Sequence, residues 1–120
     1  LLFWVLGIYL LISILLYYLQ DYLLFKPEVL PADFQYQYDN QEVVEYDFKT
    51  RDGANINGLH FKVDKPIGVV LYLKGNSKSM KGWGKFAVDF NRHRYDVIMV
   101  DYRGFGKSTG RRSQKAVRND

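Results

Sequence analysis

The stretch from Val97 to Ser108 reads VIMVDYRGFGKS, and it decides how the rest of the chain is interpreted. Together with Tyr95 and Asp96 before it, the apolar run through Val100 predicts a buried strand. Asp101 follows directly, and two glycines separated by one residue then permit a tight loop. A continuous apolar run closed by a polar, glycine-containing loop is typical of a strand in a parallel sheet.

A second apolar run precedes this one and has the same character. Ile67 to Leu73 reads IGVVLYL, and a polar loop beginning Lys74-Gly75-Asn76 follows it. Residues at helical spacing separate the two runs: Trp83, Phe86, Ala87 and Phe90. Strand, crossover helix and strand predict a right-handed parallel unit whose two strands are covered on both faces.

An antiparallel hairpin is predicted in front of this unit. Glu42 to Thr50 partly alternates apolar and polar residues, Arg51-Asp52-Gly53 is a turn signal, and Ile56 to Val63 forms the second arm. The fold class is therefore α/β, with a hairpin followed by parallel strand-helix-strand, and another helix can begin around Ser113 to Val117. We expect this unit to be incomplete, because buried parallel strands need more neighbours than roughly 100 soluble residues supply.

The N-terminal residues predict a membrane anchor. Leu1 to Leu19 carries no charge, and about 20 apolar residues are enough to cross a bilayer as a helix. A cleaved signal peptide would need a small-residue cleavage site, and a buried soluble helix would need a polar face. We expect an anchor over residues 1–20, a linker over residues 21–41 and the α/β domain over residues 42–120.

Composition narrows the possible classes of protein. The 120 residues hold no cysteine, which excludes a disulfide scaffold, a thiolate zinc site and a cysteine nucleophile. The one apolar span predicts a single-pass protein. Lys26 is the only basic residue within about 15–20 positions after the span, which favours a non-cytoplasmic body. The chain opens on Leu1 rather than Met, so we expect residues upstream of it.

The motifs resemble the α/β-hydrolase superfamily, over roughly residues 42–110 together with the anchor. The nearest branch is the membrane-anchored serine-aminopeptidase-like group, in which a strand ends His-Gly-Asn and the next is followed by Asp-Tyr-Arg-Gly-x-Gly-x-Ser. The resemblance implies a serine hydrolase that acts, in its full-length form, on an ester, thioester or peptide bond of a small molecule or peptide. It implies no metal and no cofactor.

The resemblance also assigns roles to the first loop. In this fold a backbone N–H after the third strand stabilises the oxyanion of acyl transfer, which makes Asn76 the preferred donor and Gly75 and Ser77 its neighbours in the oxyanion hole. The alternative is a simple turn, since Gly, Asn and Ser favour turns. Lys74 stands where the family has His, and a lysine cannot accept a hydrogen bond as a neutral imidazole can.

The loop that begins at Asp101 is expected to have a structural role and to take no part in the reaction. Gly104 and Gly106 permit its tight path, and Asp101 can accept backbone N–H bonds or pair with Arg103. The same structural role is expected of Ser108. A phosphate-binding loop is not supported, because the third glycine of the G-x-G-x-x-G pattern is missing.

No catalytic triad is expected within this chain. The G-x-S-x-G motif is absent, and His60 and His93 lie outside the family's position, as expected of surface histidines. The serines at 77, 79, 108 and 113 have no plausible base. Two other hypotheses remain open: a catalytically inactive membrane-tethered binding or scaffold protein, and a basic module touching anionic lipid headgroups. Nucleic acid is not expected, because the aromatic residues fall at core spacing.

Overall fold

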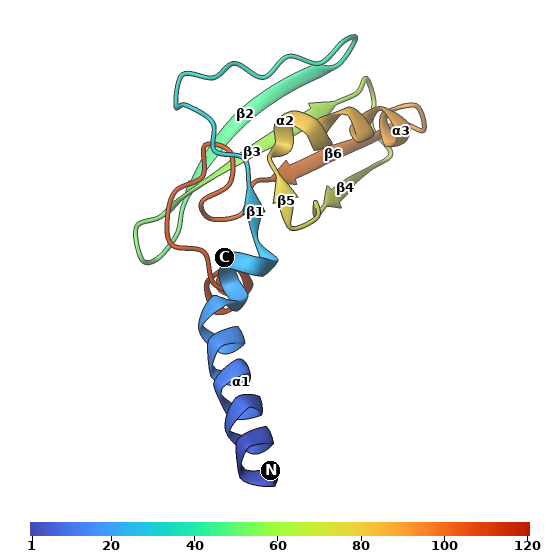
Figure 1. The fold of residues 1–120 in the computed structure, drawn as a ribbon. Helices are drawn as coiled ribbons and strands as arrows, with labels where there is room; N and C mark the ends of the chain where they lie inside the picture. The colour runs from blue at the N-terminus through green and yellow to red at the C-terminus, as the bar shows by residue number, and fades with distance from the viewer.

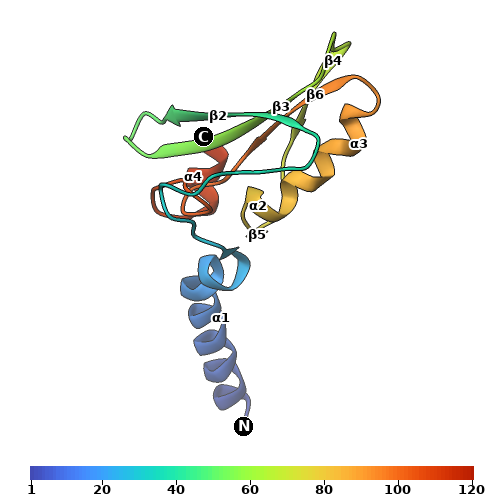
Figure 2. The same ribbon diagram turned by 90° about the horizontal axis from the view of Figure 1, so that it is seen from above.

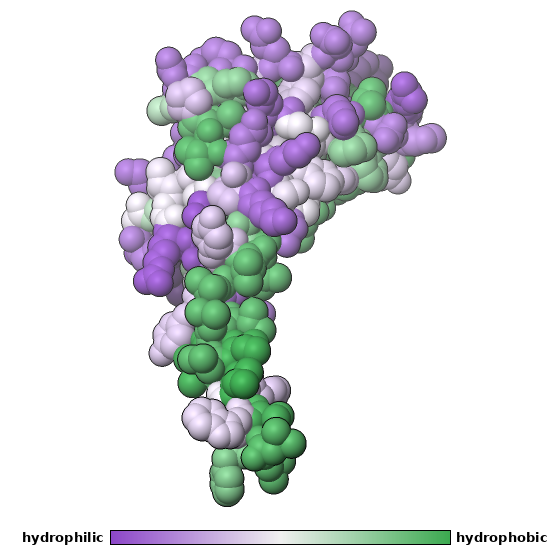
Figure 3. All heavy atoms as spheres, viewed as in Figure 1, coloured by the Kyte–Doolittle hydropathy of each residue, from purple (hydrophilic) through white to green (hydrophobic).

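The uncharged N-terminal run forms one helix, α1 (Leu2–Leu24), in the computed structural model, which describes residues 1–120. The helix continues five residues beyond the uncharged run and ends before Pro27, which disfavours helix in the residue preceding it. None of its residues is buried. It projects from the rest of the chain as an apolar rod (Figures 1 and 3). Its length and composition are sufficient to cross a membrane.

The body is built on a four-stranded mixed sheet. The strands are β2 (Glu42–Lys49), β3 (Asn55–Lys62), β4 (Gly68–Tyr72) and β6 (Tyr95–Val100). Their order is β2-β3-β6-β4; β2 and β3 are antiparallel, as are β3 and β6, whereas β6 and β4 are parallel. The predicted hairpin and the predicted parallel pair are both confirmed.

The crossover between the parallel strands is helical, as its spacing predicts, but it is not one regular helix. It consists of α2 (Met80–Trp83), a 3₁₀ turn η1 (Gly84–Phe86) and α3 (Ala87–Asn91). The ring of Tyr38 lies where a side chain at Gly84 would stand, so only glycine fits there. A short strand, β5 (Ser77–Lys78), precedes α2 within the segment predicted to be a loop.

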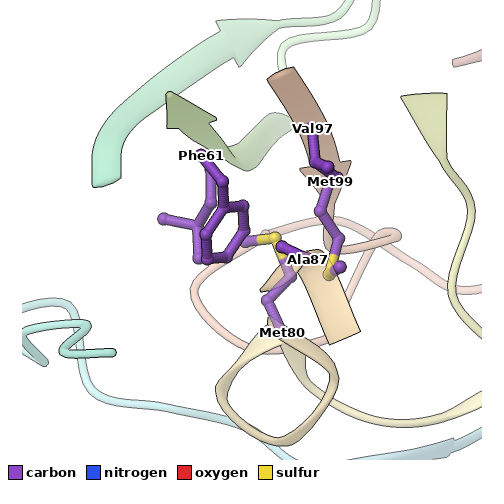
Figure 4. Close-up of a cluster of buried hydrophobic side chains, with 6 residues drawn as sticks. Phe61, Met80, Ala87, Val97 and Met99 are labelled. Carbon is purple, nitrogen blue, oxygen red and sulfur yellow. The ribbon is translucent and has the colours of Figure 1, made fainter. Parts of the chain in front are cut away.

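The core lies between this crossover and one face of the sheet. Figure 4 shows Met80 and Ala87 from the crossover facing side chains of β3 and β6. Its six members are Leu59, Phe61, Met80, Ala87, Val97 and Met99. Burying these side chains removes apolar surface from water, which is the main favourable term in folding.

The opposite face of β4 is open, which corrects one prediction. Val69 and Leu71 are 59% and 62% exposed, so β4 is covered on one face only. A helix does begin near the predicted position, as α4 (Gln114–Asn119), and the Ser113 hydroxyl caps it by accepting the Ala116 N–H. An open hollow of about 1330 Å³ lies between α4 and this face, with Leu71 and Val117 in its walls.

The segment between α1 and the hairpin contacts the body at several points. Strand β1 (Lys26–Pro27) pairs in parallel with β5, and Val29 forms an isolated bridge with Gly106. Farther along, Tyr38 donates a hydrogen bond to the Met80 carbonyl at 2.6 Å, and its ring packs on Phe61. Figure 2 shows this segment running along the sheet between α1 and β2.

Two phenylalanines are expected to contribute unequally to the free energy of unfolding. Phe61 is fully buried, so Phe61→Ala is expected to lower the free energy of unfolding by about 3–5 kcal/mol. Phe86 is 38% exposed, and Phe86→Ala should cost about 1 kcal/mol or less. Urea unfolding followed by tryptophan fluorescence measures both changes, and equal losses would contradict this account of the core.

Candidate functional site

Two loops meet at the carboxyl edge of the sheet. One follows β4 and begins with Lys74; the other follows β6 and begins with Asp101. Because β4 and β6 are parallel neighbours, the two loops lie side by side, and ligands of open α/β sheets bind at this edge. The hydroxyl of Tyr102 joins the loops by donating to the Lys74 carbonyl at 2.6 Å.

The side chain of Lys74 is buried between the two loops. Its ammonium lies 3.5 Å from a carboxylate oxygen of Asp101, and neither side chain is exposed to solvent. It also donates to the carbonyls of Gly75 and Lys78, each at 3.4 Å. The ring of Phe105 lies below it, with its centroid 4.0 Å away. These contacts compensate the lost hydration of the ammonium and hold the loop after β4 to the loop after β6.

Asp101 is the second half of this pair. Its two carboxylate oxygens accept the Met80 N–H, at 3.0 and 3.1 Å, which fixes the start of α2. Burial raises the pKa of Asp101 to about 6, although the Met80 N–H and Lys74 both act to lower it. Burial likewise lowers the pKa of Lys74, against the opposing effect of Asp101.

The predicted partners of Asp101 are correct in part. The prediction that it accepts a backbone N–H is confirmed, but the alternative pairing with Arg103 is wrong. The Arg103 guanidinium binds Asp52 and Asp120, both at 2.5 Å. It thereby ties the hairpin turn to the end of the chain, while the Asp101 side chain points to the other side of the loop, toward Lys74.

The loop after β6 needs its two glycines and its serine. Gly104 and Gly106 have φ angles of 68° and 52°, in the region that favours glycine. A side chain at Gly106 would overlap the Asp101 carboxylate. The Ser108 hydroxyl donates to the Asp101 carbonyl at 2.6 Å and accepts the Asn57 N–H at 2.9 Å. These contacts hold the loop after β6 against β3.

The three residues proposed for the oxyanion hole lie at the carboxyl end of β4. Gly75 and Asn76 are exposed, and neither backbone N–H donates a hydrogen bond within the protein. Ser77 lies in β5 and is half-buried. Gly75 does not have a positive φ; a Cβ there would lie 3.0 Å from the Trp83 ring, so a larger residue would require this ring to shift by a few tenths of an ångström.

The histidines and serines form no catalytic set. His93 is exposed, but His60 is half-buried and hydrogen-bonds Asp96 at 2.8 Å, so the expectation of a surface histidine is wrong for His60. The buried Ser79 hydroxyl donates to Glu28 at 2.7 Å. No cluster of three or more His, Asp or Glu side chains that could hold a metal ion is present.

Sequence reasoning missed the residues that surround the loop after β4. The rings of Tyr102 and Phe105 flank Lys74, and Glu28 bonds the buried Ser79. Tyr102 and Phe105 belong to the second motif, and Glu28 belongs to the linker. The sequence gives no sign that they lie close together in space, because the contacts join positions up to 51 residues apart.

A family model described as alpha/beta hydrolase fold matches residues 68–120, which begin at β4 and include both loops. Two solved structures with a similar fold are the esterase Pf2001 of Pyrococcus furiosus and an alpha-beta hydrolase of Vibrio vulnificus. The first has a TM-score of 0.52 at 19% identity, over 74% of this chain and 35% of the esterase. The second has a TM-score of 0.53 at 19% identity, over 65% of this chain and 26% of that protein.

Curated relatives cover the same region. The uncharacterized protein YfhR of Escherichia coli K12 is 28% identical over 95 residues, which are 75% of this chain and 34% of YfhR. The YfhR protein of Salmonella typhi is 27% identical over 78 residues, 61% of this chain and 27% of that protein. The chain thus spans about a third of the length of the curated relatives it matches.

The buried pair predicts an unusual pH dependence of stability. Because the pKa of Asp101 rises to about 6 in the folded state, folding binds a proton as the pH falls through that value. The free energy of unfolding should therefore increase by about 1 kcal/mol between pH 7 and pH 5. Asp101→Asn should remove this increase. Urea unfolding in detergent at both pH values measures the difference, and an identical pH response of the two proteins would contradict it.

The sheet order, the structural likeness and the family match over residues 68–120 agree with one another. They also agree with the resemblance seen in the sequence motifs. An apolar helix long enough to span a membrane precedes the sheet. The chain therefore has the fold of the α/β-hydrolase family.

Proposed function

We propose that this chain is the N-terminal part of a membrane-anchored serine hydrolase, in which the Asn76 N–H is a donor of the oxyanion hole. The observation that carries this proposal is the pair of unbonded N–H groups at Gly75 and Asn76. They lie at the carboxyl edge of the sheet, on a loop held by the buried Lys74–Asp101 pair.

The chemistry of acyl transfer explains why such a loop matters. Attack on a carbonyl places negative charge on its oxygen, and fixed N–H donors stabilise that charge without having to reorganise. One such donor is worth about 3 kcal/mol of barrier lowering. The bonds of Lys74 to the carbonyls of Gly75 and Lys78 restrain the loop that carries the two unbonded N–H groups.

The nucleophile elbow, the acid and the histidine would come from outside these 120 residues. The chain covers about a third of its curated relatives, and the uncovered face of β4 offers apolar surface on which further helices can pack. The serine-aminopeptidase-like branch suggests an ester, thioester or peptide bond as the target. Lys74 at the family's histidine position is the one feature that favours an inactive binding protein instead.

The anchor completes the proposal. Helix α1 crosses the bilayer once, with three tyrosines (Tyr17, Tyr18 and Tyr22) near the interface where their rings are favoured. With Lys26 as the only basic residue close behind the helix, the body lies on the non-cytoplasmic side. Cysteine labelling from one side of sealed vesicles tests this orientation.

The experiment that tests the function is labelling with a serine-reactive fluorophosphonate. The natural protein is expected to react at a serine outside residues 1–120 and to hydrolyse a short aryl ester. The 120 residues alone should show neither labelling nor turnover above background. Absence of labelling of the natural protein would instead favour the inactive tethered binding protein.

Two substitutions at one position test the role of the backbone N–H. Asn76→Pro removes this donor, so kcat of the natural protein should fall about 10²–10³-fold. Asn76→Ala keeps the N–H and is the matched control, with a much smaller effect expected. Circular dichroism verifies that both variants fold. Equal activity of the two variants would show that this N–H does not stabilise the oxyanion.

A further inference from the structure

We propose that the carboxyl edge of the sheet rests on the membrane surface and that the substrate is an amphiphilic acyl ester or thioester held in the same membrane. This inference deepens the proposed function and rests on it. It follows from how the end of α1 is bonded to the two loops of the candidate site.

The loop after β4 is bonded directly to the end of the apolar helix. The Asn76 side chain donates to the Leu24 carbonyl at 2.7 Å, and the Lys26 N–H donates to the Asn76 carbonyl at 3.0 Å. The parallel pairing of β1 with β5 continues this contact as far as Pro27 and Lys78. The residue proposed to bind the oxyanion is therefore hydrogen-bonded to the last residue of the membrane-spanning helix.

The loop after β6 is held by the same segment. The Gly106 N–H donates to the Glu28 carbonyl at 2.7 Å, and the Leu30 N–H donates to the Gly106 carbonyl at 2.9 Å. The rings of Phe25 and Phe105 meet edge to face, with their centroids 6.1 Å apart. The chain between anchor and body is therefore not a free tether, and the carboxyl edge of the sheet faces the helix end (Figure 1).

The depth of this contact follows from the charges that end the apolar run. Residues 1–20 carry no charge, and Asp21 and Lys26 are the first charged side chains after them, so the polar headgroups begin near the last turn of α1. Leu24 then lies at the boundary between the acyl chains and the headgroups. The ester carbonyls of membrane lipids lie at the same boundary, so Asn76 is at the level of a lipid-borne acyl group.

Basic residues lie at the same level as the helix end. Arg111 and Arg112 line a hollow of about 300 Å³ together with Asp21 and Tyr22 from the last turns of α1. Arg111 is exposed and forms no ion pair. Each basic side chain close to an anionic surface contributes about 1 kcal/mol of attraction. Headgroup contact here would hold the body against the bilayer.

A depth measurement tests the placement. The 120 residues contain no cysteine, so Arg111→Cys and Asp64→Cys each introduce a single thiol within them; Asp64 is exposed in the turn between β3 and β4. The natural protein, labelled with bimane, is placed in phosphatidylcholine vesicles containing phosphatidylglycerol and a headgroup nitroxide lipid. Strong quenching at 111 and little at 64 is expected. Equal quenching at the two positions would overturn the placement.

A lengthened anchor tests the substrate class. A Gly/Ser segment of about twelve residues inserted between Leu24 and Phe25 frees the edge from the surface. Two hydrolysis rates are then compared, that of umbelliferyl oleate in vesicles and that of umbelliferyl acetate in solution. The ratio of the first rate to the second should fall roughly tenfold or more. An unchanged ratio contradicts a membrane-held substrate. A protein that fails to react with fluorophosphonate at all contradicts the hydrolase proposal instead, so the two failures are distinguishable.

Discussion

The buried ion pair between Lys74 and Asp101 is the interaction on which the candidate site depends. Two charges without solvent exposure are stable together only if further groups compensate their lost hydration, and removing one partner typically costs 3–5 kcal/mol. Here the compensation comes from the Met80 N–H, two backbone carbonyls and the rings of Tyr102 and Phe105. Each of these groups belongs to one of the two loops or to the start of α2, so the pair fixes all three segments together. The exposed N–H groups of Gly75 and Asn76 owe their fixed position to this arrangement.

The chain that follows α1 is bonded to the same two loops. Residues 25–30 run between the two loops and hydrogen-bond both of them, so helix α1 and the candidate site form one structural unit. A hydrolase that is merely tethered would need only a flexible linker at this place. The bonded connection instead fixes the direction in which the candidate site faces relative to α1. The proposed substrate class therefore depends on the proposed position of the membrane.

The sequence predicted the strands and the hairpin well, because alternation and continuous apolar runs directly reflect which faces are buried. It indicated that Gly104 and Gly106 permit a tight loop, and both have a positive φ. It could not predict that Asp101 pairs with Lys74 rather than Arg103, since the choice depends on which side of the loop the carboxylate faces. The β1–β5 pairing could not be predicted either, because strands of two residues are too short to show a periodic pattern. The exposed face of β4 also differs from expectation, since an apolar run shows that a strand is suited to burial on both faces and not which elements cover them.

A crystal structure of the natural protein after reaction with a fluorophosphonate would test the central claim most directly. The account predicts that the phosphonyl oxygen accepts the Asn76 N–H at about 2.7–3.1 Å, with Lys74 still paired to Asp101 beneath the loop. A phosphonyl oxygen bound by other donors, with the Asn76 N–H directed elsewhere, would contradict the assignment of this loop to the oxyanion hole.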